Sequence, residues 1–531
     1  MPKKTIPYSK TGYFSKLICD YLAEKEALRS FYHRFPKLEH FEAQFQEKKR
    51  SVRAQTRTIL KESLQKQYKG IALSEATRAN IESLSEANTF TITTGHQLNL
   101  FTGPLYFLYK IFSVINLSEK LNEKYPNNHF VPVYWMATED HDFEEINYFN
   151  CFGKKMAWNR TAGGAVGELS TEGLDEVLKV LKNELGDSEH ARRLISLFAE
   201  AYTKHNSLTD ATRYLGNALF EDYGLVIVDG NDAALKKAFI PYVEKELFEG
   251  VSYKKISETT RRLTDLGYPE QVHSREVNLF YLKKGMRERI IAQDGRFFVN
   301  DTEISFSKSE IEKELQQHPE RFSPNALLRP LYQEVILPNL CYIGGGGELA
   351  YWFQLKDYFD AVQVPFPILL LRNSVLLISE KQKAALSKLE VSFASLFLQQ
   401  NELVTQETHR RSEVAIDFSK QRSHLQRQFE DLYTLAKRTD ASFVGAVAAQ
   451  EKKQLNGLDH LEKRLLKAQK RKLASELSRL TTLQDALFPS RSLQERHTNF
   501  SEYYLEYGDG LLHKLKENLD PLAGEFTVIT L

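Results

Sequence analysis

The sequence predicts an α/β protein whose core is a parallel sheet, followed by a long helical arm. A β-branched and aromatic run at 90–93 precedes a helical pattern of apolar residues at 105–121 and a nearly all-apolar run at 130–136. An apolar strand of that kind suits a parallel sheet covered on both faces. Past residue 374 there is almost no Gly or Pro before Pro489, and leucines recur among charges of both signs. This pattern favours long antiparallel helices that form a coiled coil.

Length and composition exclude several classes of protein. A chain of 531 residues is too long for one core, so several units are expected. The formal charge of +1 argues against a general nucleic-acid binder. No stretch has the length of a membrane span, the N-terminus lacks a secretory signal, and the cysteines show no disulfide or metal-ligand spacing. We therefore expect a cytoplasmic protein without a membrane partner.

The strand–helix–strand unit carries polar residues where each strand ends. The first strand runs into Gly95-His96-Gln97, and the second into Glu139-Asp140-His141-Asp142. Because open α/β sheets bind ligands outside the carboxyl ends of their strands, we expect the two segments side by side at a cleft. A run at 224–228 that ends in Asp229 repeats the arrangement and predicts a third parallel strand.

The remaining elements follow from local patterns. Helices are expected within 15–85 and at 174–185, 189–204 and 209–221, the last capped by Ser207 or Thr209. Short, partly alternating runs at 277–282, 287–292 and 296–299, with a turn at Asp294-Gly295, predict a small antiparallel insertion. A core strand is expected at 366–371 and a final strand at 526–531, which rejoins the body. The arm is a natural homodimer surface, although a monomeric helical hairpin explains the same leucine pattern.

Each chemical motif also has an ordinary structural interpretation. His96 at a strand-to-helix turn could contact an anion or serve only as a hydrogen-bonding turn residue. The acids and imidazole at 139–142 form either a set of mutually perturbed titratable groups or a solvated loop. Carboxylates with imidazole suit Mg2+ or Zn2+, but we favour a site without metal, because successive residues of an extended segment point to opposite sides. Gly344–Gly347 could cradle an anion or form a flexible turn, and Arg329 and Arg372 suit carboxylates, phosphates or ordinary ion pairs.

Four longer motifs resemble the bacillithiol-synthesis cysteine-adding enzymes, the BshC family of cysteine ligases. The resemblance covers almost the whole chain in one order. It lies in TGHQLNLFTGPLY at 94–106, VPVYWMATEDHDFEEIN at 131–147, SPNALLRPLYQE at 323–334 continuing through GGGGELAYW at 344–352, and FPSRSLQER at 488–496.

The resemblance implies a Rossmann-like core of the nucleotidyltransferase type with two connecting insertions and a coiled-coil arm that dimerises. The expected units are 1–150, the first part of the core with N-terminal helices; 151–222, a helical insertion; 223–232, a core strand; 233–322, an insertion with a small antiparallel sheet; 323–375, the end of the core; 376–490, the coiled coil; and 491–531, a segment returning to the body.

It also implies that the enzyme joins the carboxyl of L-cysteine to the amine of glucosaminyl-malate in the last step of bacillithiol synthesis. ATP or another nucleotide would activate the carboxyl, with Mg2+ as a candidate metal. The candidate catalytic residues are His96, Glu139, Asp140, His141 and Asp142. The candidate substrate-binding residues are Gln97, Asn99, Thr102, Trp135, Asn325, Arg329, Gln333, Glu348, Tyr351 and Arg372. The candidate nucleotide-binding residues are Gly95, Gly344, Gly345, Gly346 and Gly347.

Two other hypotheses remain at this stage. The same cleft could serve a nucleotidyltransferase that acts on another small acid. Alternatively, the protein could be a non-catalytic scaffold whose arm recruits other enzymes of a thiol-synthesis pathway. The polar groups at three strand ends count against the scaffold, which does not need them.

Overall fold

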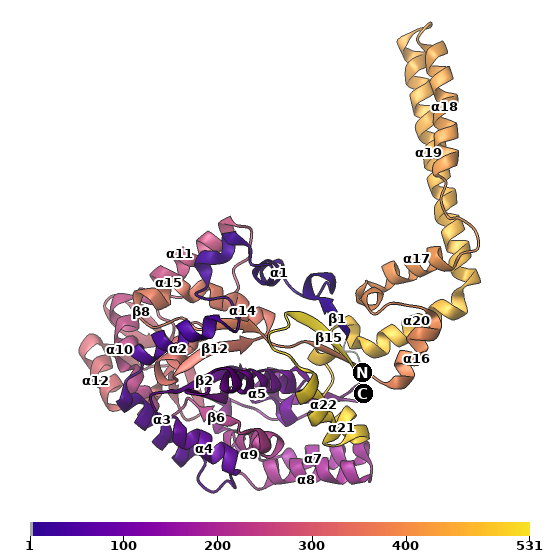
Figure 1. Ribbon diagram of the computed structural model, residues 1–531. Coiled ribbons are helices and arrows are strands. Elements are labelled where there is room, and N and C mark those ends of the chain that lie inside the picture. Colours follow the sequence, from indigo (N-terminus) through magenta and orange to yellow (C-terminus); the bar gives the residue numbers. More distant parts are fainter. Residues whose placement is uncertain (1–3) are drawn as a thin grey trace.

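A parallel sheet in the order β13-β12-β2-β3-β6 forms the centre of the computed structural model, which describes residues 4–531 (Figure 1). β2 and β3 pair along their whole length, with Gly95 opposite Trp135 and His96 opposite Met136. The predicted strand–helix–strand unit and the third parallel strand are therefore confirmed. The strands are β2 Thr89–His96, β3 His129–Met136, β6 Val226–Asp229, β12 Asn339–Gly344 and β13 Ile368–Leu371.

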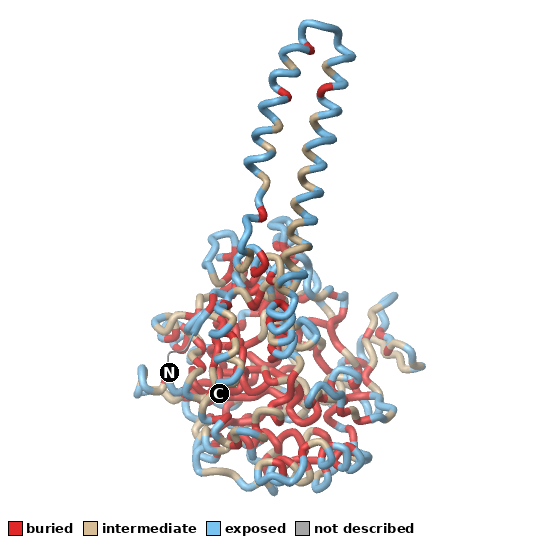
Figure 2. Tube along the Cα trace, turned by 90° about the vertical axis from the view of Figure 1, so that its right-hand side faces the viewer, coloured by how far each residue is buried: buried red, intermediate tan, exposed pale blue. Residues whose placement is uncertain are grey.

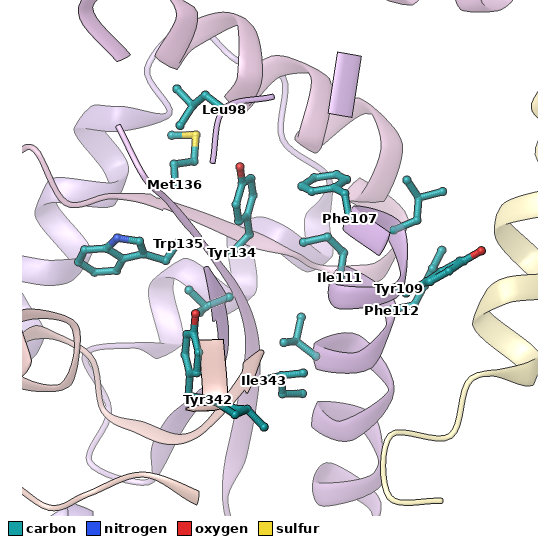
Figure 3. Packing of buried hydrophobic residues seen from close by; sticks show 14 of the residues in the cluster. Leu98, Phe107, Tyr109, Ile111, Phe112, Tyr134, Trp135, Met136, Tyr342 and Ile343 are labelled. Carbon is teal, nitrogen blue, oxygen red and sulfur yellow. The ribbon is translucent and has the colours of Figure 1, made fainter. Parts of the chain in front are cut away.

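The sheet lies in a continuous apolar core. Every residue of β2 is buried, as expected for a parallel strand that is covered on both faces. The crossover helix α5 (Tyr106–Lys124) packs on β2 and β3. Neighbouring side chains of β3 alternate: Tyr134 contacts Phe107 of α5, whereas Trp135 points away from that helix and contacts Tyr332 (Figure 3). This alternation places Trp135 on the side of the sheet where the site forms.

The helices predicted within 15–85 and at 174–185, 189–204 and 209–221 are present, whereas the helices within 233–265 and 308–361 were not predicted. Ser207 is the residue that caps α9, because its hydroxyl accepts a hydrogen bond from the Asp210 amide. The helices are α1 Lys16–Leu22, α2 His40–Ser51, α3 Ala54–Gln67, α4 Glu75–Ser83, α6 Phe143–Ile146, α7 Leu174–Leu185, α8 Glu189–Thr203, α9 Leu208–Phe220, α10 Ala233–Glu249, α11 Val251–Asp265, α12 Lys308–Gln317, α13 Arg329–Ile336, α14 Gly346–Trp352 and α15 Lys356–Ala361.

The predicted antiparallel insertion is present as a sheet in the order β10-β9-β8-β7-β11. Its β8–β9 hairpin turns at Asp294-Gly295, where both residues have positive φ, as the turn type requires. The strands are β7 Leu279–Lys283, β8 Met286–Gln293, β9 Arg296–Val299, β10 Ser305–Ser307 and β11 Phe322–Pro324. Since β11 ends next to the core helix α13, this sheet is joined closely to the end of the core.

Two parts differ from the expectation of continuous helix. Residues 151–222 open with the short hairpin of β4 (Tyr148–Cys151) and β5 (Lys154–Ala157). The stretch after residue 374 begins with strand β14 (Val375–Ile378), whose short apolar run resembles the leucine pattern of the helices that follow. β14 pairs with β15 (Glu525–Thr530), which also pairs with β1 (Lys4–Pro7), so the predicted final strand joins a separate small sheet.

The arm is an antiparallel pair of helices, α18 (Ser419–Ala436) and α19 (Ala441–Lys472), that projects from the body (Figure 1). Most of its residues are exposed, in contrast to the buried body (Figure 2). Leu432, Leu435 and Leu461 are among the exposed large apolar side chains. Within residues 4–531 no helix is both long and apolar enough to span a membrane. The remaining helices are α16 Glu380–Leu389, α17 Gln400–Arg411, α20 Ala474–Leu487, α21 Ser501–Tyr507 and α22 Gly510–Asn518.

A buried ion pair ties the segment after the arm to the core. Glu495, in the short 3-10 helix η10 (Gln494–Arg496), accepts a 2.8 Å hydrogen bond from Arg372 and a 2.9 Å bond from the Val375 amide. Gln494 exchanges hydrogen bonds with both backbone groups of Leu377. These two side chains therefore satisfy the free edge of β14, which would otherwise be an unpaired strand edge.

Replacing Glu495 by Gln should destabilise the protein strongly. The Arg372 guanidinium and the Glu495 carboxylate are buried, with side chains 5% and 0% exposed, so the variant leaves a buried charge without its counter-charge. We expect a loss of about 3–5 kcal/mol in the free energy of unfolding, measured by urea denaturation.

Glu476→Gln is the matched control, since Glu476 pairs with Arg411 but is 48% exposed. Its cost should stay below about 1 kcal/mol. Equal midpoints for the two variants would contradict the role assigned to Glu495.

Candidate active site

A cavity of ≈ 570 Å³ opens at the carboxyl ends of β2, β3 and β12. One wall comes from the polar segments after β2 and β3, and another from the antiparallel insertion with Phe280, Arg287 and Arg289. Its volume lies within the range of about 300–1,000 Å³ that is typical of ligand pockets. The predicted site residues that line it are Gly95, His96, Gln97, Trp135, Glu139, Asp140, His141, Asp142, Asn325, Arg329, Glu348 and Tyr351.

The other predicted residues lie behind these walls. Arg372 is buried on Glu495, so its charge already has an internal partner. Gln333 accepts a 3.0 Å hydrogen bond from Arg329 and donates to Glu334, which forms a fully buried ion pair with Lys48. Asn99 and Thr102 line a separate small cavity behind His96, and Gly344–Gly347 line neither of the two cavities.

Glu139 is held by a lysine that the sequence analysis missed. Lys236 of α10 is buried, donates to the Glu139 carboxylate and also to the Phe322 carbonyl. Burial raises the pKa of Glu139, while the Lys236 charge acts in the opposite direction. A carboxylate fixed in this way is better suited to a structural role in the cavity wall than to proton transfer.

Asp140, His141 and Asp142 form a turn rather than the extended segment expected from the sequence. The Asp140 Oδ1 atom accepts hydrogen bonds from the backbone amides of His141 and Asp142 at 2.7 and 3.3 Å. Gln97 donates to the other Asp140 oxygen at 2.9 Å, which links the ends of β2 and β3. Asp140 therefore organises the turn, and Asp142 keeps an exposed carboxylate with no hydrogen bond within residues 4–531.

The turn changes the argument about a metal ion. One ligand atom from each of Asp140, His141 and Asp142 lies within 4.8 Å of the others. The three side chains therefore do not point to opposite sides, as they would in an extended segment. A carboxylate and imidazole set of this kind fits a divalent cation. The Arg287 guanidinium, 2.6 Å from the His141 Nδ1 atom, opposes a second positive charge at that nitrogen.

Arg287 fixes the proton on His141. It is buried, stacks on Phe280 and also donates to Ser323. Because a guanidinium can only donate, the His141 Nδ1 atom accepts, and the neutral ring carries its proton on Nε2. The imidazole therefore presents a donor, not a base, to the cavity.

A second ion pair forms the floor between β2 and β12. Lys110 of α5 is buried, donates to the Gly95 carbonyl at 2.7 Å and pairs with Glu348. Tyr342 donates to the same carboxylate at 3.1 Å. Burial lowers the pKa of Lys110, and Glu348 acts in the opposite direction. Arg329, which extends over the Tyr342 ring, completes a positively charged corner around Glu348.

Arg275 and Arg289 are the free cations of the cavity wall. Their side chains make no hydrogen bond or ion pair with any residue in the described part of the chain. Arg287 and Arg289 are two residues apart in β8, a spacing that places both side chains on one face of the strand. That alternation was the available signal for Arg287 and Arg289. The signal for Lys110 was a lone charged residue in the apolar stretch 106–118 of α5.

Two family models match consecutive parts of the chain. One is described as "Bacillithiol biosynthesis BshC, N-terminal Rossmann-like domain" and matches residues 1–373. The other is described as "Bacillithiol biosynthesis BshC, C-terminal coiled-coil domain" and matches residues 375–531. The chain belongs to the BshC family. The predicted resemblance, the Rossmann-like core and the coiled-coil domain are thereby confirmed.

Relatives over the full length carry the name "Putative cysteine ligase BshC". One from Christiangramia forsetii is 58% identical over 100% of this chain and 99% of its own, and one from Flavobacterium johnsoniae is 56% identical over 100% of both. A more distant relative from Bacillus cereus is 28% identical over 86% of this chain and 87% of its own.

Protein stability should depend on pH through His96. The ring is buried, and burial together with the nearby Lys110 charge lowers its pKa well below the usual value. Below about pH 6.5 the unfolded chain binds a proton at this residue that the folded protein does not, so stability is lost as the pH falls. Between about pH 7.5 and 5.5, the wild type should lose about 1.4 kcal/mol more than His96→Gln in urea denaturation.

If the free energy of unfolding changed with pH in the same way for the wild type and His96→Gln, His96 would not be buried in its neutral form. His409→Gln serves as the control, because His409 is an exposed residue near the end of α17. This variant should follow the wild-type curve.

Proposed function

We propose that the protein joins the carboxyl of L-cysteine to the amine of glucosaminyl-malate, the last step of bacillithiol synthesis. Membership of the BshC family and the names of the relatives support a cysteine ligase. The observation that carries the assignment of this substrate is the cavity itself. Its lining includes the exposed Asp142 carboxylate, 3.9 Å from the His141 Nε2 atom, and the side chains of Arg275 and Arg289, which are unpaired within residues 4–531.

The negative and positive side chains of the cavity suit the two ends of glucosaminyl-malate, its amine and its malyl carboxylates. Malyl carboxylates are matched by arginine, whose guanidinium donates two parallel hydrogen bonds to a carboxylate. We assign this role to Arg275 and Arg289, in place of the expected Arg372, whose charge is satisfied by Glu495. The amine of the sugar would then lie toward the 140–142 turn.

Amide formation requires a proton acceptor and an activated carboxyl. As the new carbon–nitrogen bond forms, the activating group leaves the cysteine carbonyl and the amine loses a proton. Asp142 is the acceptor in our proposal, because Glu139 is paired with Lys236 and the His141 ring presents a donor. His141 would instead hydrogen-bond an oxygen of the reacting group.

A nucleotide such as ATP would supply the activating group, and Mg2+ would accompany its phosphates. The positively charged corner of Lys110 and Arg329 beside Glu348 fits such an anion. The chain's own contribution would be to orient the phosphates and to exclude water from the buried floor of the cavity.

The decisive experiment incubates the purified protein with cysteine, glucosaminyl-malate, ATP and Mg2+, and follows bacillithiol by mass spectrometry. Each component is omitted in turn. Product that requires all of them, with AMP or ADP released, supports the proposal. Asp142→Asn should remain folded and lose most of the activity. Failure to form product with folded protein would refute the proposed reaction.

Arg289→Met should raise KM for glucosaminyl-malate. Loss of a charge-assisted hydrogen bond costs about 1.5–3 kcal/mol, which corresponds to roughly 10–150-fold in KM. KM for cysteine should stay the same, and kcat should change little, because Arg289 is assigned to binding and not to proton transfer.

Arg296→Met is the matched control, since Arg296 lies in the next strand, is exposed and is outside the cavity. Equal KM values for this variant and Arg289→Met would contradict the assignment of Arg289.

We also propose that the arm joins two copies of the chain. The exposed Leu432 and Leu435 lie on α18, and the exposed Leu461 lies on α19. Burial of such residues against a second copy would remove apolar surface from water. Sedimentation of the wild type as a dimer and of Leu435→Lys as a monomer would support this, and a monomeric wild type would refute it.

A further inference from the structure

A second, very small cavity lies behind His96. It is lined by residues of the loop after β2, including Asn99 and Thr102, and by Thr212 and Gly216 of α9. The volume open to the centre of a water molecule is ≈ 10 Å³. One bound water needs roughly 10–15 Å³ on this measure, so the cavity has room for about one.

Four polar atoms on the lining residues have no hydrogen-bond partner. They are the His96 Nε2, the Asn99 Oδ1 and the hydroxyl oxygens of Thr102 and Thr212, and each is closed to bulk solvent. The four residues are between 4% and 8% exposed. A buried polar group without a partner costs about 1–3 kcal/mol, so four around one cavity require an explanation.

The hydrogen-bonding capacities of these four atoms match those of water. The Asn99 amide donates through Nδ2 to the Glu145 carbonyl, which leaves Oδ1 as an acceptor. The His96 Nε2 atom is buried and has no partner within the described residues. In the neutral tautomer that carries its proton on Nδ1, Nε2 is an acceptor. The two threonine hydroxyls supply two donors.

The loop that carries these residues has a strained backbone. Phe101 and Thr102 both have positive φ, at 47° and 68°, which is unfavourable for an aromatic and a β-branched residue. A Cβ atom on Gly103 would lie 2.7 Å from the Asn99 Cβ, so the loop is closed tightly on itself. This conformation brings the Asn99 and Thr102 side chains to the same cavity.

We propose that the cavity holds one water molecule, which donates to His96 Nε2 and Asn99 Oδ1 and accepts from the Thr102 and Thr212 hydroxyls. All four hydrogen-bonding positions of the water are then filled, as in well-ordered buried waters. The water then occupies the Nε2 atom of His96, which is therefore not available to the substrate. His96 is a positioning residue that joins the turn after β2 to α9, rather than a catalytic base.

Thr212→Val tests the proposal, because it removes a donor while keeping the shape of the side chain. With the water present, the variant loses one of four hydrogen bonds, and the melting temperature should fall by about 1–3 °C. Thr212 does not line the large cavity, so this measurement is independent of substrate binding and of the proposed reaction.

Thr527→Val is the matched control. The Thr527 hydroxyl is also buried and without a partner, but the residue lines none of the cavities described above. Its replacement by Val should leave the melting temperature unchanged or raise it, because an unsatisfied hydroxyl is removed. If Thr212→Val behaves in the same way, the proposal is wrong.

A crystal structure that resolves ordered water gives the direct test. A density peak within hydrogen-bond distance of all four atoms would support the proposal. A cavity without density, or side chains rearranged to bond one another, would overturn it.

Discussion

The parallel pairing of β2 with β3 is the constraint on which the site depends. The two strands stay in register up to His96 and Met136, so the segments that follow them leave the sheet at the same edge. Gln97 then reaches Asp140 through a direct hydrogen bond. A one-residue slip would reverse the faces on which the side chains of β3 lie and would turn Trp135 away from the cavity.

Buried lysines determine the charge distribution at the carboxyl-terminal edge of the parallel sheet. Lys236, Lys110 and Lys48 come from three different helices, and each is paired with a glutamate at or behind the site. A charge in a medium of low dielectric constant is tolerated when it is paired and hydrogen-bonded. The cavity groups without an ion-pair partner of this kind in the described part of the chain include the side chains of Arg275 and Arg289, which are therefore available to a ligand.

The sequence was informative where a pattern has a local physical cause. The apolar runs of β2, β3 and β6, the turn at Asp294-Gly295 and the cap at Ser207 each reflect a short-range rule, and the structure confirms them. The resemblance in the longer motifs placed most of the predicted residues at one cavity.

Residues whose role depends on distant partners could not be predicted in this way. Arg372 and Glu495 are 123 positions apart, and only folding shows that they satisfy each other. The same holds for Lys236 and Glu139, and for Arg287 and His141. The extended conformation expected for 139–142 was wrong for a local reason, because Asp140 accepts two amide hydrogen bonds and converts the segment into a turn.

The small sheet β1-β15-β14 has a consequence for the order of folding. It pairs residues 4–7 with residues 525–528, so β1 can form this pairing only after all the residues between the two strands have been synthesised. During translation, β1 and β14 must wait with unpaired edges while more than a hundred residues of arm and tail emerge. The arm lies between β14 and β15 in the sequence, so this small sheet can be completed only after the whole arm has been synthesised.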